Sequence, residues 1–151
     1  MNRTLIVRIS ALVLIGALAA CAKSSESSSS ASAAPSAAVA ENGAAAADGA
    51  KVFETNCSSC HQANGQGIAG TFPPLAGNPV VTGDATTVIH IVKYGLNGKI
   101  MVAGGNYNGM MPAWGQQLSN ADIASVLTYV RSSWGNKASA VTESAVAAVA
   151  Q

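Results

Sequence analysis

The sequence predicts a small all-α domain of about three main helices and two long loops, preceded by an export signal and a flexible segment. Apolar residues recur at helical spacing near the end of the chain, two long stretches are rich in glycine and proline, and no strand-like alternation competes. The chain has 151 residues, and its uneven composition indicates that only part of it folds, as one domain. Two Phe, two Trp and three Tyr supply little aromatic core, so we expect a bound group to help hold the domain together.

Residues 1–20 have the layout of a secretory signal. Arg3 and Arg8 precede an apolar run from Ile9 to Ala20, which ends in small residues. The run is shorter than the roughly 20 residues that a spanning helix needs, although an uncleaved anchor stays as the alternative. Without the two arginines the net charge of +1 becomes about −1, which leaves no basic footprint for nucleic acid. We therefore expect export and no nucleic-acid binding.

The end of this signal resembles the lipobox of bacterial lipoproteins. Its sequence is L-A-A-C at residues 18–21, and the resemblance implies cleavage before Cys21 and a lipid on the Cys21 thiol. Each buried acyl methylene contributes about 0.8 kcal/mol, so several chains would hold the protein firmly on a membrane. We expect a lipid anchor in a bacterial membrane, with the folded domain in the periplasm or on the outer face of the cell membrane.

Composition divides the rest of the chain into three parts. Residues 21–46 comprise the expected lipidated Cys and a Ser- and Ala-rich segment almost without bulky apolar side chains, which predicts a flexible tether. Residues 47–137 are the expected folded domain. Residues 138–151 resemble the tether but contain more Val, and we expect a disordered tail, with a frayed helix as the alternative.

Capping signals and glycine or proline clusters divide the first half of the domain. Asp48 can cap a first helix over Gly49 to Asn56. Gln62 to Gly83 is so rich in Gly and Pro that we expect a long loop without regular structure. Asp84 can cap a second helix that ends at about Tyr94.

The last helix is the most strongly indicated. It follows a second long loop, Leu96 to Leu118, and Ser119 with Asp122 resembles a capping box at its start. Loops of this length in so small a domain usually wrap a bound group. The apolar positions at helical spacing are Ile123, Val126, Leu127, Val130 and Trp134.

Residues 57–61, C-S-S-C-H, have the C-x-x-C-H spacing of covalent haem attachment. Two thiols at this spacing can each bond one vinyl group of the same haem, and the adjacent His then lies under the iron. A disulfide, a thioredoxin-like redox pair and a zinc site are the alternatives. The redox pair needs a βαβ setting, and a zinc site needs four ligands, with only His90 as a further strong candidate. We predict one covalent haem c on Cys57 and Cys60, with His61 as an iron ligand.

With this motif, residues 47–137 resemble a class I cytochrome c. That family has a Gly and an aromatic residue eight and four positions before the first Cys, and Gly49 and Phe53 stand there. The resemblance implies that they cross the last helix near Val126 and Tyr129, where Gly49 lets the two backbones approach. It also implies the small class I cytochrome c fold, in which helices and loops wrap around a covalent haem.

The resemblance implies two further site residues. Pro73 stands where the family has a Pro twelve positions after the proximal His, so its carbonyl is expected to accept the second ring N–H of His61. The segment Gly109 to Trp114 is similar to the family's distal Met-Pro-x-Trp segment, which makes Met111 the expected sixth iron ligand. A thioether favours ferrous iron, so a His and Met pair raises the reduction potential.

Three other side chains compete with Met111 for the iron. Met110 and Met101 are the other methionines of this loop, and a methionine in a domain is more often core filler than a metal ligand. His90 carries an imidazole, but it lies among apolar residues of the second expected helix, a setting typical of a partly buried histidine with a hydrogen-bond partner. Met111 is the expected ligand because Pro112 follows it.

The function that the resemblance implies is electron transfer without a small-molecule substrate or catalytic residues. The expected partners are respiratory redox proteins, namely a dehydrogenase, an oxidase or a reductase. One alternative is a subunit of a larger dehydrogenase, oxidase or nitrite-reductase complex, because Tyr107 to Asn136 looks similar to cytochrome domains of such enzymes. Another is a five-coordinate haem protein that reacts with gases or peroxide, which Met111 opposes.

Overall fold

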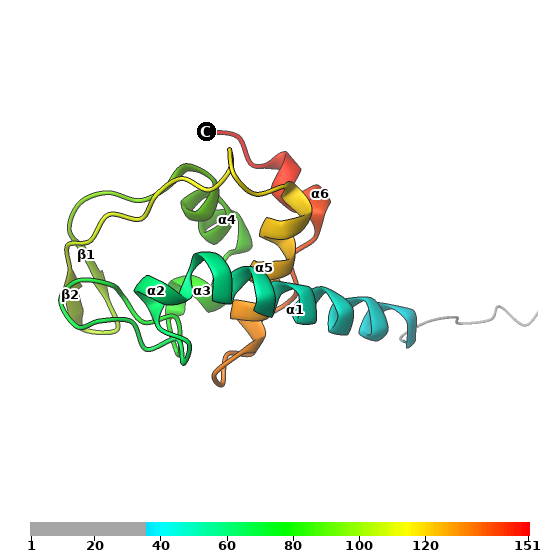
Figure 1. Ribbon diagram of the computed structural model, residues 1–151, viewed down its shortest axis with the longest axis horizontal. Helices are drawn as coiled ribbons and strands as arrows, with labels where there is room; N and C mark the ends of the chain where they lie inside the picture. Colours follow the sequence, from blue (N-terminus) through cyan, green and yellow to red (C-terminus); the bar gives the residue numbers. More distant parts are fainter. Residues whose placement is uncertain (1–35) are drawn as a thin grey trace, which may run out of the picture. The chain divides into compact units, whose positions relative to one another are not determined.

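Helices are the predominant regular structure of residues 36–151, and one two-stranded sheet accompanies them (Figure 1). The computed structural model describes residues 36–151, with side chains described from residue 45 onward except Ala47. The predicted signal, Cys21 and the first part of the predicted tether lie outside the described residues. The elements in chain order are α1 (Ser36–Asn56), α2 (Ser58–His61), α3 (Pro79–Thr82), α4 (Ala85–Tyr94), β1 (Ile100–Val102), β2 (Gly105–Tyr107), α5 (Asn120–Ser132) and α6 (Glu143–Ala148). None of the helices within residues 36–151 combines the length and the hydropathy needed to cross a membrane.

The first helix begins earlier than the sequence predicts. Because α1 starts at Ser36, Asp48 lies inside the helix and does not cap it. Residues 36–46, expected to belong to the flexible tether, are helical instead. This segment is rich in alanine, which brings little apolar mass but has the highest helix propensity of all residues. A composition low in apolar mass predicts weak packing, but it does not prevent a helix from forming.

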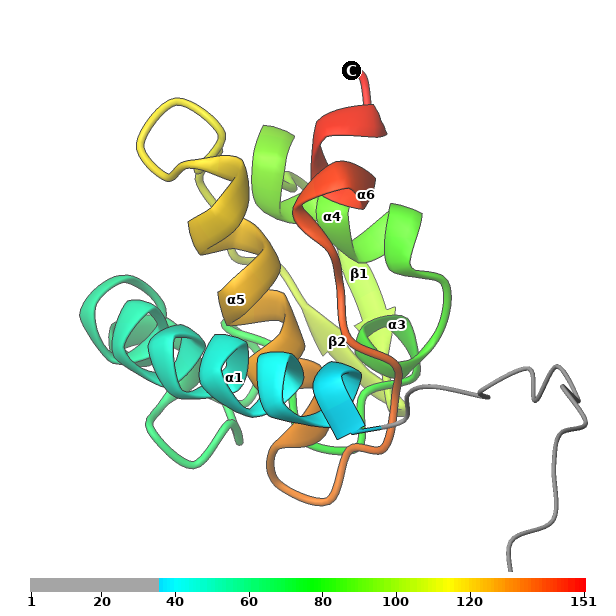
Figure 2. The ribbon, with the colours of Figure 1, turned by 90° about the vertical axis from the view of Figure 1, so that its right-hand side faces the viewer.

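α1 packs across α5, and Figure 2 shows α1 passing in front of that helix. Gly49 lies at the crossing, where an added Cβ would stand 2.0 Å from the carbonyl oxygen of Ser125 and 2.9 Å from the Cβ of Tyr129. One turn later, the ring of Phe53 lies 5.6 Å from that of Tyr129, centroid to centroid. Phe53 also belongs to a buried cluster with Val126. The helix crossing implied by the family resemblance is therefore present.

The caps predicted for α4 and α5 are confirmed. The side chain of Asp84 accepts a hydrogen bond from the amide of Thr87 at the start of α4, and Gly95 ends that helix with a φ of 81°. At the start of α5, the side chains of Ser119 and Asp122 each bond the other residue's backbone amide, which completes a capping box.

Two short elements lie in loops that were expected to have no regular structure. Asn78 caps α3 by accepting from the amide of Val80, and Pro79 occupies the first helical position. This Asn-Pro pair is a helix-start signal that the richness in proline concealed. β1 and β2 pair as an antiparallel hairpin around Ala103 and Gly104, whose φ angles are 49° and 79°. Such turns favour Asn-Gly, so Ala103 gave no hairpin signal.

The C-terminal segment, residues 138–151, is folded, which contradicts the predicted disordered tail. Thr142 caps α6 by accepting from the amide of Ala145, and α6 lies beside α4 and α5 in both views (Figures 1 and 2). Val141, Val146 and Val149 are buried in a cluster that α4 and α5 complete. The valines that distinguished this segment from the tether are the side chains that anchor it.

α5 is shared by two apolar clusters. One cluster joins α5 to α4 and α6, and Ile123 and Leu127 are its α5 members. The other joins α5 to α1 and α3 through Val126 and Val130. α5 therefore fixes α1 and α4, which carry much of the candidate site.

Candidate functional site

The C-S-S-C-H segment lies where α1 passes into α2. The Cys57 amide donates to the Phe53 carbonyl at 2.9 Å, and the His61 amide donates to the Cys57 carbonyl at 3.0 Å. Helical bonding thus continues through the segment and places Cys57, Cys60 and His61 on the wall of one cavity. Both cysteines are half-buried free thiols, so the structure does not contain the disulfide that was one alternative.

The ring of His61 is oriented by the first loop. Its Nδ1 lies 3.0 Å from the carbonyl oxygen of Pro73, the contact that the resemblance implied. Since a carbonyl only accepts, the proton is on Nδ1 and the lone pair is on Nε2. Burial lowers the pKa of His61, and the bond to Pro73 opposes this shift only in part. The imidazole is therefore neutral near pH 7, with a free nitrogen lone pair on a cavity-lining residue, as a metal ligand requires.

Burial also governs the cysteines. It raises the pKa of the Cys57 thiol to about 11, and the neighbouring Cys60 adds to the rise. Cys57 is consequently a neutral thiol near pH 7. A thioredoxin-like pair needs an attacking cysteine with a lowered pKa, so this environment weighs against that alternative. Among the described residues, no group of three or more His, Cys, Asp or Glu side chains is placed to hold a metal ion such as the zinc considered above.

The cavity has a volume of about 690 Å³. This size falls within the roughly 300–1,000 Å³ typical of sites for cofactors and small molecules. The end of α1, both long loops, α3, α4, the hairpin and α5 all contribute to its walls. Apolar side chains predominate among them and include Leu75, Val81, Val88, Ile91, Val92 and Val126.

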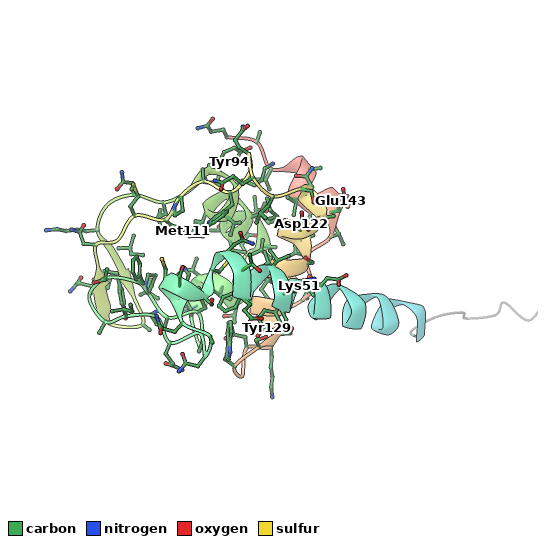
Figure 3. All side chains as sticks on the ribbon, viewed as in Figure 1. Lys51, Tyr94, Met111, Asp122, Tyr129 and Glu143 are labelled. Atoms are coloured by element: carbon green, nitrogen blue, oxygen red, sulfur yellow. The ribbon has the colours of Figure 1, made fainter. Side chains whose placement is uncertain are left out.

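Met111 lines the same cavity from the second loop, in the segment between the sheet and α5 (Figure 3). Its backbone pairs with that of Leu96 through two hydrogen bonds, of 3.0 Å and 2.9 Å, directly after the end of α4. Gly95 fits beneath this pair, since a Cβ there would stand 2.7 Å from the Met111 carbonyl oxygen. The predicted sixth ligand therefore has a fixed backbone position on the cavity wall.

The competitors of Met111 are placed less favourably. Met101 and Met110 also border the cavity, but 74% and 68% of their surfaces are exposed, whereas Met111 is half-buried. His90 is exposed rather than partly buried as expected, lies against Tyr94 with tilted rings at 4.9 Å between centroids, and does not line the cavity. The structure thus brings His61 and Met111 to one cavity and leaves His90 outside it.

Asn136 is a site-supporting residue that the sequence did not reveal. Asn136 follows α5 in the chain, and its side chain is buried. Its amide nitrogen donates to the carbonyls of Leu75 at 3.0 Å and Val130 at 2.8 Å. Its side-chain oxygen accepts from the Gly77 amide at 2.9 Å. These bonds tie the loop that carries Pro73 to the end of α5. The loop partners Leu75 and Gly77 stand about sixty positions away, and no local pattern signals such contacts.

Comparisons with known proteins agree with this geometry. The sequence profile of the family described as cytochrome c matches residues 46–134. The chain is 45% identical over 94 residues to cytochrome c-552 of Thermus thermophilus, which covers 60% of this chain and 70% of that protein. It is 39% identical over 92 residues to the cytochrome c subunit of alcohol dehydrogenase (quinone) of Gluconacetobacter polyoxogenes, covering 60% of this chain but 19% of that subunit. To the Cbb3-type cytochrome c oxidase subunit CcoP of Azospirillum brasilense it is 33% identical over 95 residues, or 59% of this chain and 28% of that subunit.

A small helical domain built around an apolar cavity with a C-x-x-C-H wall defines a covalent haem-binding protein. The profile match extends over more than half of the chain, and the chain belongs to the cytochrome c family. It is therefore an electron carrier of the haem c type rather than an enzyme in its own right. The residues present fit the haem, because free thiols, an oriented neutral imidazole and apolar walls meet at one cavity.

Proposed function

We propose that this chain is an exported, lipid-anchored monohaem cytochrome that transfers single electrons between respiratory redox proteins. The observation that carries the proposal is that Cys57, Cys60, His61 and Met111 all line one apolar cavity. The match to the cytochrome c family supports the haem, and the names of several relatives support redox partners.

Each of these residues has a distinct role in the proposal. Cys57 and Cys60 would hold the haem through thioether bonds, and His61 and Met111 would be the protein ligands of its iron. When bound, haem c supplies an iron that is reversibly oxidised and reduced by one electron. The chain holds both ligands in fixed positions, through Pro73 for His61 and through Leu96 for Met111. The apolar walls would keep water away from the bound haem.

Cys21 is the proposed site of lipid attachment. The lipobox-like sequence at residues 18–21 supports this assignment, as do the basic and apolar stretches before it. The haem domain would then be held at a bacterial membrane, in the periplasm or on the outer face of the cell membrane. Its donor and acceptor would be membrane or periplasmic dehydrogenases, oxidases or reductases.

A second candidate function is a cytochrome subunit of a larger oxidoreductase complex. The relatives named as subunits of alcohol dehydrogenase (quinone) and of a Cbb3-type oxidase favour it. This alternative changes the partner and leaves the haem chemistry unchanged. Solubilisation of membranes in mild detergent, followed by purification of the tagged chain, separates the two. A stoichiometric enzyme partner indicates a subunit, and a chain that purifies alone indicates a mobile carrier.

The ligand assignment is tested by optical spectra of the full chain, produced in an exporting host with haem-attachment machinery. We expect a low-spin spectrum with a methionine-to-iron band in the oxidised state, and Met111→Ala should abolish that band. Met110→Ala is the matched control, since it removes an exposed neighbouring methionine and should leave the band in place. A wild-type chain that is high-spin and binds added gases would overturn the electron-carrier proposal in favour of gas or peroxide chemistry.

The anchor is tested separately. We expect the mature chain to fractionate with membranes and to carry a lipid-sized mass increment on Cys21. Cys21→Ser should move the haem-loaded chain to the soluble exported fraction with an unchanged spectrum. Mass spectrometry that finds an unmodified, uncleaved N-terminus would show that the lipid assignment is wrong.

A further inference from the structure

We propose that the C-terminal segment, residues 138–151, positions Met111 for the iron by holding the end of α4 through Lys93. The inference rests on the proposed function, because it takes Met111 to be the sixth ligand. Lys93 is in this view a positioning residue, since it acts through the backbone that follows it.

The Met111 segment depends on the end of α4 for its position. Besides the two bonds between Leu96 and Met111, the Trp114 amide donates to the Val92 carbonyl at 2.9 Å and the Gly115 amide donates to the Lys93 carbonyl at 3.0 Å. The residues on both sides of Pro112 are therefore fixed to the last turn of α4 and the residues after it. A displacement of this turn would displace the thioether of Met111.

The C-terminal segment holds the last turn of α4 through hydrogen bonds. The Lys93 Nζ donates to the carbonyl of Val146 at 2.9 Å and also to that of Val149. The hydroxyl of Tyr94 donates to the Val149 carbonyl at 3.0 Å, and Figure 3 shows Tyr94 beside the C-terminal end of the chain. Val146 lies in the last turn of α6 and Val149 is its C-cap, and the partial negative charge at this end of a helix favours a lysine ammonium. Lys93 therefore links α4 to the end of α6.

The C-terminal segment can serve as an anchor because it is fixed independently of Lys93. Val141, Val146 and Val149 are buried at 6%, 0% and 8% exposure. The Thr128 hydroxyl and the Val141 backbone exchange two hydrogen bonds, of 3.2 Å and 3.0 Å, which attach the segment to α5. The family match ends at residue 134, so this anchor lies outside the part of the chain that defines the family.

A methionine ligand benefits from such an anchor. The thioether is an uncharged, soft ligand, and on ferric iron an added imidazole competes with it. The second loop spans more than twenty residues, so an unrestrained Met111 would sample many positions away from the iron. An exogenous ligand binds only the open form, and its apparent dissociation constant falls as that form becomes more populated.

The test is imidazole titration of the ferric, haem-loaded full chain, followed by loss of the methionine-to-iron band. We expect Lys93→Met, which keeps the length of the side chain without its charge, to lower the apparent dissociation constant for imidazole by about tenfold. A stop after Lys137 should lower it at least as much, and Lys93→Arg should recover most of the wild-type value. If the shortened chain fails to fold, the two Lys93 variants decide the question.

Two controls separate positioning from charge and from general stability. Lys99→Met removes an exposed lysine from the loop that carries Met111. Val52→Ala weakens packing of α1 in the apolar cluster that does not include α4. Both should retain the wild-type constant. An unchanged constant in Lys93→Met, or an equal change in either control, would overturn the inference while Met111→Ala still abolishes the band. If Met111→Ala leaves the band intact, the ligand assignment itself has failed.

Discussion

Gly49 lies so close to Ser125 that a Cβ on the glycine would stand 2.0 Å from the serine's carbonyl oxygen. The oxygen belongs to the backbone of α5 and the Cβ position is set by the backbone of α1, so no side-chain rotation relieves the contact, and α1 would have to move away from α5. We expect Gly49→Ala to lower the free energy of unfolding by about 3 kcal/mol or more. Guanidinium unfolding of the haem-loaded chain measures this, and Lys51→Ala, at an exposed position on α1, should change the value by less than about 0.5 kcal/mol.

Arg131 connects α5 to two other backbone segments from a buried position. Its guanidinium donates to the carbonyls of Val81 at 2.6 Å, Gly83 at 3.1 Å and Ser139 at 2.9 Å. Arg131→Met would leave these oxygens without that donor, and relief from burying the charge would offset only part of the loss. We expect a destabilisation of about 2 kcal/mol.

Denaturant unfolding with a matched variant checks this prediction. Lys137→Met also exchanges a cation for methionine, but at an exposed position, and should cost less than about 0.5 kcal/mol. Arg131→Lys should cost an amount between these two values, because one ammonium cannot reach the Ser139 carbonyl and the carbonyls of Val81 and Gly83 together. Equal stabilities of Arg131→Met and Lys137→Met would mean that the three contacts contribute nothing.

Asn136 provides a test of the loop that carries Pro73. In Asn136→Asp, a carboxylate would face the carbonyl oxygens of Leu75 and Val130, which now accept from the amide nitrogen. Repulsion would raise the pKa of the new carboxyl above its unfolded value of about 3.9. Stability should therefore be lost as the pH rises from that unfolded pKa through the higher folded pKa. At lower pH the protonated carboxyl can donate one bond and the deficit should shrink.

Thermal melts of Asn136→Asp between acid and neutral pH measure this dependence. Asn64→Asp is the control, because Asn64 is exposed and only its oxygen makes a hydrogen bond, accepting from the Gln66 amide. We expect the deficit relative to wild type to grow with pH for Asn136→Asp alone. A deficit that is the same at every pH would contradict a role for the charge.

The parts of the site that the sequence predicted are encoded locally. Cys57, Cys60 and His61 form one contiguous motif, and Met111 is marked by the proline that follows it. Helix caps are similarly local, which is why Asp84 could be identified from the residues around it. In each case the chemistry needs residues at a short, fixed spacing, so a pattern search can find them.

The parts that the sequence did not reveal depend on distant residues. Lys93 meets the carbonyl of Val146 across 53 positions, and Asn136 meets that of Leu75 across 61. Backbone carbonyls are available on every residue, so neither contact requires a recognisable partner in the sequence. The same holds for the C-terminal segment, whose valines become a buried face only because α4 and α5 lie beneath them.

Asp84 gives the chain a predictable response to acid. Its carboxylate accepts bonds from the amide of Thr87 and the amide of Thr86, and these hold the pKa of Asp84 below its usual range. A lowered pKa in the folded state means that the charged cap stabilises the domain above the unfolded pKa of about 3.9, and that this contribution is lost as pH falls through the folded pKa.

Asp84→Asn keeps a cap of similar quality without the charge, so it isolates this contribution of Asp84. We expect the variant to melt with the wild type at strongly acid pH and below it from about pH 5 upward, where the carboxylate also favours the N-terminus of α4. Asp84→Ala, which removes the cap itself, should melt lower than wild type at every pH. Melting temperatures recorded across this range decide the matter, and a constant gap between Asp84→Asn and wild type would show that the charge of Asp84 does not stabilise α4.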